Sequence, residues 1–231
     1  AFNQMAEDVE QGARERELML AGVSHDLRTP LTRLRLALEL LHSDAELTED
    51  MVRDIEDMDA ILDQFLAFIR DGRDEAPEEI DLGALIHDVV APYNQQQERV
   101  RLCLEAMPPL PLRRVSIKRL LVNLIENALR YGGHGVEVAA YVTGSCGAPY
   151  VVLSVLDRGA GVDPAELDAI FNPFIRGDRA RGGKGTGLGL AIVKRIAALH
   201  GGSVELRNRS GGGMEARVCL PIGLMLPRDA V

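Results

Sequence analysis

The chain has 231 residues, 46% of them apolar, and a net charge of −9; this suits one large or two modest domains and argues against a nucleic-acid-binding surface. Its cysteines, Cys103, Cys146 and Cys219, lie far apart without metal-ligand spacing, so we interpret them as reduced thiols of a cytosolic protein. No apolar run reaches the ~18 residues of a membrane span, and no signal peptide is evident. The sequence begins without Met, so the possibility of a membrane anchor upstream stays open.

Apolar residues recur every three or four positions in two successive segments. The first stripe runs through residues 18–41 and the second through residues 51–69, with a turn between them and Thr48 as the N-cap of the second. This spacing predicts a helical hairpin over residues 18–70. One hairpin is hard to stabilise alone, whereas two hairpins from two chains bury both stripes in a four-helix bundle. We therefore expect a homodimer.

Beyond a charged segment at residues 71–79, which is typical of a linker, the pattern changes to α+β. The predicted helices lie at residues 81–93, 116–132 with Ser116 as its cap, 163–171 and 185–202. The predicted strands lie at residues 99–106, 135–143, 150–157, 202–209 and 213–222. Because the strands look mostly antiparallel, we expect helices on one face of a mixed sheet.

Two glycine clusters stand out, at residues 157–161 directly after a strand and at residues 182–190 directly before a helix. Glycines let a backbone approach a ligand closely, and a glycine loop that opens a helix presents N–H groups to phosphate oxygens. A flexible surface loop and an ordinary turn are the equally weighted alternative for either cluster alone. Neither cluster has the spacing of a Walker loop or a Rossmann fingerprint.

The helix predicted at 116–132 carries Asn123 and Asn127 one turn apart on one face, away from its apolar stripe. Two carboxamides plus water can hold Mg²⁺, which prefers hard oxygen ligands. A polar surface pair is the alternative, and it is the stronger one on spacing alone. Arg130 and Tyr131 follow near the C-terminal end of this helix. There the aromatic ring of Tyr131 suits a nucleotide base, and the cation of Arg130 suits a phosphate.

Together these motifs resemble a sensor histidine kinase over nearly the whole chain. The segments that resemble the family's phosphoacceptor, asparagine, first glycine, phenylalanine and second glycine boxes are "SHDLRTPL", "NLIENALRYG", "DRGAG", "FNPFIRGD" and "GTGLGLAIV". Residues 1–17 resemble the end of a HAMP-like linker helix. The resemblance implies a phosphotransfer hairpin at 18–70, a linker at 71–79, a catalytic ATP-binding domain at 80–224 and a tail at 225–231. It also implies the cytoplasmic part of a bacterial inner-membrane protein, with membrane segments only upstream.

The family implies a Bergerat-type α/β sandwich, related to the ATP-binding domains of gyrase and Hsp90, that uses ATP and Mg²⁺. By that resemblance Asp157 accepts from the adenine exocyclic amine, and Asn127 holds Mg²⁺ with Asn123 beside it. Tyr131 packs on the base and Arg130 reaches phosphate. A lid that starts at Arg176 and includes Lys184 closes over the triphosphate. The other nucleotide-binding residues implied are Gly159, Gly161, Gly177, Gly185, Thr186, Gly187, Leu188, Gly189 and Leu190.

His25 is the only histidine that combines an exposed helical position with acid and hydroxyl neighbours, although an ordinary surface histidine is the commoner case. Its imidazole is mostly neutral and nucleophilic at pH 7. Asp26 can fix one ring nitrogen and take up its proton, while the other nitrogen attacks the γ-phosphorus of ATP. The resemblance implies transfer to a response regulator, of the OmpR type, and Thr29 as the residue of a phosphatase activity on that regulator.

Two other functions compete with the kinase. One is a Bergerat-type ATPase or chaperone with the hairpin as a dimerisation arm, although such an arm has no need of "HDLRT" at residues 25–29. The other is a helical adaptor with a degenerate ATP fold, against which the intact glycine clusters and both asparagines argue. The motifs do not reveal the stimulus, the identity of the regulator, or whether a subunit phosphorylates itself or its partner.

Overall fold

The computed structural model divides the chain into two compact units, Ala1–Asp71 and Gly72–Val231. The division falls at the start of the predicted linker, residues 71–79. The residues that the structure describes are 31, 32, 34, 36, 51–53, 55, 56, 58, 59, 62, 75–132, 135–144, 149–167, 169–173, 175 and 187–222.

In the first unit, every described residue is helical, as the apolar stripes predict. Ile55 is buried, but three other stripe residues, Leu34, Met51 and Met58, remain 45% to 55% exposed. A single chain therefore leaves part of its apolar stripe uncovered. His25, Asp26 and Thr29, on which the predicted chemistry of this unit depends, lie outside the described residues.

The second unit is built on a five-stranded mixed sheet with the strand order β2-β4-β5-β7-β6. Its strands are β2 (Val100–Leu104), β4 (Val136–Thr143), β5 (Tyr150–Leu156), β6 (Ser203–Asn208) and β7 (Met214–Pro221). The pair β2–β4 is parallel and the other three pairs are antiparallel. A separate two-stranded antiparallel sheet consists of β1 (Glu78–Ile80) and β3 (Leu110–Leu112).

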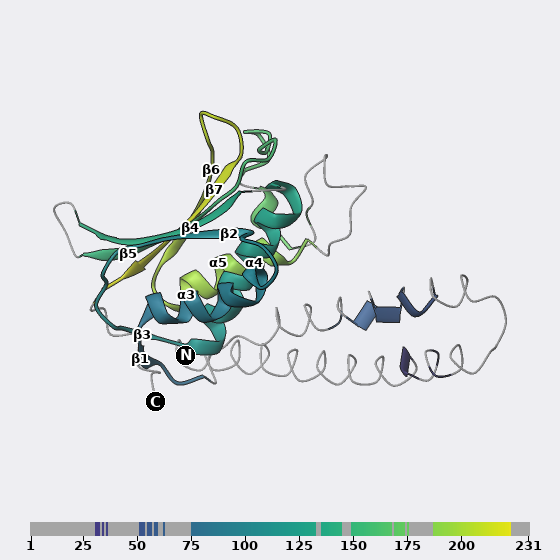
Figure 1. The fold of residues 1–231 in the computed structure, drawn as a ribbon, viewed down its shortest axis with the longest axis horizontal. Coiled ribbons are helices and arrows are strands. Elements are labelled where there is room, and N and C mark those ends of the chain that lie inside the picture. The colour runs from purple at the N-terminus through teal and green to yellow at the C-terminus, as the bar shows by residue number, and fades with distance from the viewer. Residues whose placement is uncertain are drawn as a thin grey trace, which may run out of the picture. The chain divides into compact units, whose positions relative to one another are not determined.

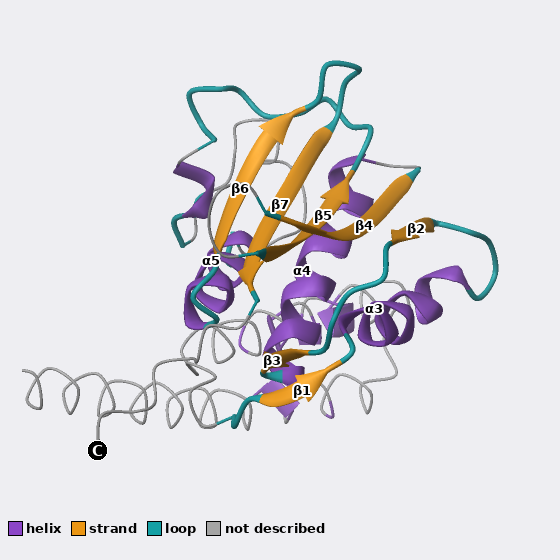
Figure 2. Ribbon diagram, turned by 90° about the vertical axis from the view of Figure 1, so that its left-hand side faces the viewer, coloured by secondary structure: helices purple, strands orange, loops and turns teal. Residues whose placement is uncertain are grey.

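Three α-helices lie against one face of the five-stranded sheet, as Figures 1 and 2 show. They are α3 (Leu82–Val90), α4 (Arg114–Gly132) and α5 (Gly189–Leu199), and two 3₁₀ turns, η1 (Ala91–Asn94) and η2 (Ala169–Phe171), complete the unit. Burial alternates along β4 and β7, so every second side chain faces the helices. The core between the layers is aliphatic, with Leu121, Ile125, Val138, Leu153 and Val218 fully buried. The predicted α+β fold, with helices on one face of a mixed sheet, is confirmed.

Four local predictions differ from the structure. Strands β1 and β3 were not predicted, and β1 lies partly in the segment that its charge assigned to the linker. In the segment predicted as one helix over residues 163–171, residues 164–167 form a turn and Ala169–Phe171 form the short η2. Helix α5 starts at Gly189 and not at residue 185. Helix α4 starts at Arg114, so Ser116 lies in its first turn and is not its N-cap.

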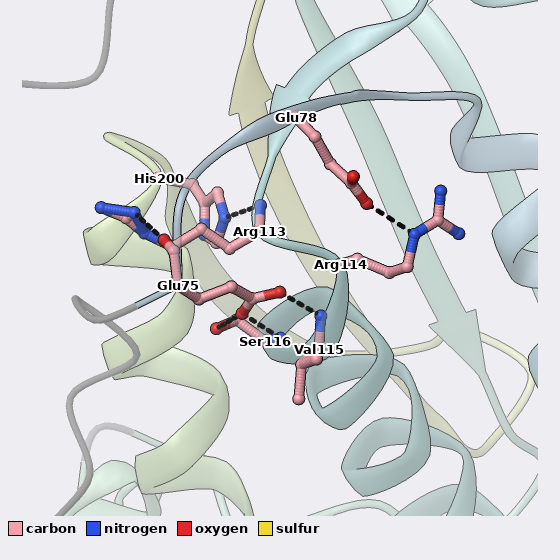
Figure 3. A network of polar contacts seen from close by, with 7 residues as sticks. All are labelled: Glu75, Glu78, Arg113, Arg114, Val115, Ser116 and His200. Atoms are coloured by element: carbon pink, nitrogen blue, oxygen red, sulfur yellow. Dashed lines mark hydrogen bonds and ion pairs between the residues drawn. The ribbon is translucent and has the colours of Figure 1, made fainter.

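The first turn of α4 is capped by Glu75, a residue far upstream in the sequence (Figure 3). One carboxylate oxygen accepts from the Val115 amide at 2.5 Å, and the other accepts from the Ser116 amide at 3.0 Å and the Ser116 hydroxyl at 2.8 Å. A carboxylate at this position satisfies N–H groups that have no partner within the helix, and its charge opposes the positive end of the helix dipole.

A buried histidine links the end of α5 to the start of α4 (Figure 3). The Arg113 amide donates to Nε2 of His200 at 3.0 Å, and Arg113 Nη1 donates to the Glu75 carbonyl at 2.8 Å. Because Nε2 must accept, the ring proton sits on Nδ1, which donates to the Ile196 carbonyl at 2.8 Å. His200 is 3% exposed, and burial is the main reason that its pKa is lowered, with the Arg113 charge adding to the effect. The folded chain therefore holds this ring neutral.

We predict that His200 makes the stability of the chain fall in mild acid. Below its ordinary pKa of about 6.5, the unfolded chain takes up a proton at His200 that the folded chain refuses, so stability drops by at most about 1.4 kcal/mol per pH unit down to the lowered folded pKa. His200→Gln should remove this slope. The measurement is urea unfolding of both proteins between pH 7.5 and pH 5.

At pH 7.5 we expect the free energy of unfolding of the wild type to exceed that of His200→Gln by roughly 1–3 kcal/mol, because the variant loses buried hydrogen bonds. This difference in unfolding free energy should become smaller as the pH falls. The exposed His87 on α3 provides the control, since His87→Gln should leave the stability at pH 7.5 unchanged. A difference that stays constant from pH 7.5 to pH 5 would contradict the assignment of the neutral ring.

Candidate functional site

Helix α4 presents its two asparagines on the side away from its buried core residues. Asn123 and Asn127 are both half-buried, whereas Leu120, Leu121 and Leu124 are 0% to 1% exposed. The amide nitrogen of Asn123 donates to the Arg119 carbonyl one turn back at 2.9 Å, which leaves the carboxamide oxygen free to face outward.

The second glycine cluster lies against this carboxamide. A Cβ placed on Gly189, the first residue of α5, would be 3.1 Å from Oδ1 of Asn123. Gly187 just before it has a φ of +72°, a conformation that glycine adopts without strain. Leu188 between them is fully buried and gives the helix no side-chain cap. The positive end of α5 therefore lies beside an amide oxygen, as a cradle for phosphate oxygens and a cation requires.

The first glycine cluster begins with Asp157, which follows β5 and is only 4% exposed. Its carboxylate Oδ1 accepts from the Gly159 amide at 2.8 Å and from the Met214 amide at 3.1 Å. Both hydrogen bonds that the described residues donate to this carboxylate go to Oδ1. The second oxygen, Oδ2, accepts no hydrogen bond from the described residues and is not among their fully buried unpaired atoms, so it can accept from a ligand that brings an N–H group.

The end of α4 touches this loop backbone to backbone. A Cβ on Gly132 would overlap the Asp157 side chain, and a Cβ on Gly159 would overlap the Tyr131 carbonyl. Only glycine fits at both positions. Tyr131 is 44% exposed, and Arg130 beside it is also exposed. Helix α4 thus lines one glycine cluster at its middle and the other at its end.

Sequence reasoning missed four residues that shape this site: Gly132, Asn208, Arg209 and Gly213. Asn208 ends β6, and Arg209 and Gly213 belong to the turn between β6 and β7, where Gly213 has a φ of +93° and would overlap the Asp157 carbonyl if it carried a Cβ. Arg209 Nη1 donates to that same carbonyl at 2.6 Å. The glycine run "GGG" at residues 211–213 signalled a turn, but no local pattern reveals what a turn packs against.

Other predicted residues are placed only in part. Lys194 on α5 lies 5.5 Å from the centroid of the Phe171 ring, which connects the start of the phenylalanine box to α5. Gly161 has a φ of +70° and lies within the first cluster, and Leu190 is half-buried in the first turn of α5. The lid residues Arg176, Gly177, Lys184, Gly185 and Thr186 lie outside the described residues.

The oxygen that the structure places beside the start of α5 belongs to the Asn123 carboxamide. Within the described ranges, no group of three or more His, Cys, Asp or Glu side chains could hold a metal ion. An amide oxygen supplies a hard ligand without charge, which fits an ion such as Mg²⁺ that keeps several waters and takes further ligands from a phosphate. Cys103 and Cys219 are free thiols, as expected, and Cys146 is not described. In the described part of the chain, none of the helices has the length and apolar character that crossing a membrane needs.

The chain matches two families that together cover most of its length. Residues 113–224 match the family described as histidine kinase-, DNA gyrase B- and HSP90-like ATPase, and these residues include α4 and both glycine clusters. Residues 15–73 match the His Kinase A (phospho-acceptor) domain, and these residues include His25.

Individual relatives agree with these matches. The chain is similar to the sensor histidine kinase GtrS of Pseudomonas aeruginosa, with 38% identity over 222 residues that cover 96% of this chain and 45% of GtrS. It is also similar to the solved histidine kinase domain of the Escherichia coli osmosensor EnvZ, with 32% identity, a TM-score of 0.51, and coverage of 68% of this chain and 95% of that one.

A third relative resembles the chain over most of its length. The structure of full-length ShkA in complex with AMPPNP has a TM-score of 0.70 and 25% identity, and the match covers 90% of this chain and 46% of ShkA. The chain therefore spans about half the length of GtrS and ShkA.

Proposed function

Since this chain belongs to the sensor histidine kinase family, we propose that it phosphorylates His25 from ATP and passes the phosphoryl group to an aspartate of a response regulator. The observation that carries this proposal is the position of α4 between the two glycine clusters. One cluster offers the second carboxylate oxygen of Asp157, and the other offers a helix N-terminus at Gly189 beside Asn123. A nucleotide has a base with an exocyclic amine at one end and phosphates at the other, so it complements both features.

Within this site, Asp157 selects adenine through its exocyclic amine, and Tyr131 packs on the base. Arg130 reaches phosphate, and the first turn of α5 receives phosphate oxygens with its amides. Asn127, with Asn123 beside it, holds Mg²⁺, which neutralises phosphate charge. A lid that runs from Arg176 through Lys184 and includes Gly177, Gly185 and Thr186 closes over the triphosphate. The bound AMPPNP in the ShkA structure supports a nucleotide for the fold.

The acceptor is His25, which lies in the part of the chain that matches the His Kinase A domain. Its unprotonated ring nitrogen forms a bond to the γ-phosphorus, and the bond from that phosphorus to the bridging oxygen breaks, so ADP leaves with the electron pair. Asp26 takes up the proton from the other ring nitrogen. A gyrase-type or HSP90-type ATPase needs no such acceptor, which favours the kinase over the ATPase alternative.

We predict that His25 is the only side chain labelled when the full chain is incubated with γ-labelled ATP. His25→Gln should abolish the label and keep Mg-ATP binding, because the nucleotide site lies in the other unit. The bound phosphate should survive base but not acid, as a phosphoramidate does. His42→Gln serves as the control and should label normally.

Asp157→Ala provides the complementary variant, since it should lose Mg-ATP binding and, with it, the label. Full labelling of His25→Gln would disprove the choice of acceptor. Normal nucleotide binding by Asp157→Ala would instead disprove the placement of the base, so the two halves of the proposal can fail separately.

Histidine kinases of this family dimerise through the His Kinase A domain, and we propose the same for residues 18–70 of this chain. Exposed stripe residues such as Leu34, Met51 and Met58 support the proposal, since a second hairpin would cover them in a four-helix bundle. Sedimentation of the full chain at micromolar concentration should give the mass of two chains. A stable monomer under those conditions would contradict the bundle.

The regulator is of the OmpR type in this proposal, and the chain also removes phosphate from it. Thr29 follows His25 by one helical turn, so the two side chains share a face of the predicted helix. Its hydroxyl can bind a water molecule and direct it at a phosphoaspartate docked on that face, which is catalysis by positioning. The alternative is that Thr29 only bonds to a carbonyl of the preceding turn.

We predict that Thr29→Ala keeps autophosphorylation and lowers dephosphorylation of the regulator by about tenfold or more, the usual scale for a lost positioning contact. The assay follows the decay of a phosphorylated OmpR-type receiver domain with and without the full chain. Thr29→Ser, which retains the hydroxyl, should restore most of the rate. A parallel loss of both activities, or no loss at all, would make Thr29 a structural residue.

The whole protein is placed in this proposal at the bacterial inner membrane, with the present chain as its cytoplasmic part. Residues 1–17 then continue a HAMP-like helix from membrane segments upstream. The domain assignment is the one that the sequence predicts, with 80–224 as the catalytic domain and 225–231 as a tail, except that Glu75 and β1 attach the predicted linker to the catalytic domain.

A further inference from the structure

The loop from Asp157 to Val162 is held on the side away from α4 by the turn between β6 and β7. Asn208, the last residue of β6, binds both backbone groups of Val162: its Oδ1 accepts from the Val162 amide at 2.9 Å, and its Nδ2 donates to the Val162 carbonyl at 2.6 Å. This pair of hydrogen bonds, one accepted and one donated, is the pattern that two residues of neighbouring antiparallel strands form with each other. Gly161 lies so close to Asn208 that a Cβ there would come within 2.5 Å of the side-chain oxygen.

Arg209, the next residue, binds the other end of the same loop. Its Nη1 donates to the Asp157 carbonyl at 2.6 Å. The turn that presents it is closed by two backbone hydrogen bonds, from the Arg209 amide to the Gly213 carbonyl at 3.0 Å and from the Gly212 amide to the Arg209 carbonyl at 3.1 Å. The far end of this turn carries the Met214 amide, which donates to Oδ1 of Asp157. One turn therefore fixes both the backbone and the side chain of Asp157.

None of these bonds uses Oδ2 of Asp157, the oxygen that remains for a ligand. They determine where that oxygen lies, because the peptide from which the side chain projects is held by a charged donor, and such hydrogen bonds are roughly twice as strong as neutral ones. Without Arg209 the Asp157 carbonyl loses its charged donor, although Asn208, the Met214 backbone and the end of α4 still contact the loop. The Asp157 peptide can then shift, and the carboxylate moves with it from the position that meets an exocyclic amine.

We propose that Arg209 and Asn208 are positioning residues that set the preference of this site for adenine over guanine. The inference rests on the proposed ATP-binding function. Adenine brings an amine to Oδ2 of Asp157, whereas guanine brings a carbonyl to the same place, so a fixed carboxylate rejects guanine by leaving two acceptors facing each other. A carboxylate that can move aside loses this discrimination along with its affinity for adenine.

The test compares Mg-ATP and Mg-GTP binding to the full chain by titration calorimetry, together with the KM and kcat of autophosphorylation. For Arg209→Ala we expect the Kd for Mg-ATP to rise by about tenfold and that for Mg-GTP by less than about twofold, as a lost contact to one base predicts. KM for ATP should rise by a similar factor while kcat stays within about twofold, because the reacting phosphate is not displaced. Arg209→Lys, which keeps a donor of the same charge, should restore most of the preference.

Two further variants separate positioning from general stability. Asn208→Asp keeps the acceptor for the Val162 amide but loses the donor to its carbonyl, so its loss of preference should lie between the wild type and Arg209→Ala. Arg207→Ala is the matched control, since Arg207 is exposed on β6 and pairs with Glu205 at 2.8 Å on the sheet. It should bind both nucleotides as the wild type does.

An unchanged ratio of the two Kd values in Arg209→Ala would overturn the inference, whether both affinities fall together or neither changes. A wild type that binds Mg-ATP and Mg-GTP equally would overturn it as well, together with the selection of adenine by Asp157, but it would leave the phosphorylation of His25 intact. A wild type that binds neither nucleotide would overturn the proposed function itself, and the inference with it.

Discussion

Helix α4 is held at both of its ends, and the candidate site takes its geometry from that restraint. The Glu75 carboxylate fixes the first turn, and the close approach of Gly132 to the Asp157 side chain fixes the last one. Between these ends, fully buried leucines on one side prevent the helix from rotating about its axis. The side that bears Asn123 must then face the start of α5. A single rigid element thereby sets the spacing between a buried carboxylate and a helix N-terminus, which is the spacing that a nucleotide has to match.

Most of the fold was predictable because its signals are local. The strands predicted at residues 135–143 and 213–222 agree with β4 and β7 to within a residue at each end. The two small strands could not be found in this way, because β1 contains Glu78 and Glu79 and β3 contains Pro111, which are all unfavourable in a strand. They pair because Ile80 and Leu110 are fully buried, and that burial depends on the whole domain.

The site divides in the same way between local and distant signals. Asp157, the asparagines and the glycines of both clusters stand out in the sequence because their residue types are unusual for the elements that contain them. Gly132 and Arg209 do not stand out, since a glycine at a helix end and an arginine in a turn are ordinary. Their importance comes from contacts across 25 and 52 residues of sequence, and no pattern within a helix or a turn records such a pairing. The cap of α4 is a third case, because Ser116 matched the local rule while the acceptor came from Glu75.

That cap has a consequence for how such a domain can be recombined during evolution. This chain matches two separate families, and a module can be exchanged without loss only if the cut leaves its own contacts whole. A cut at residue 80, which the composition suggests, would separate the ATP-binding module from the carboxylate that stabilises its central helix and from most of β1. An exchangeable unit must therefore include Glu75, so part of the apparent spacer belongs to the catalytic fold.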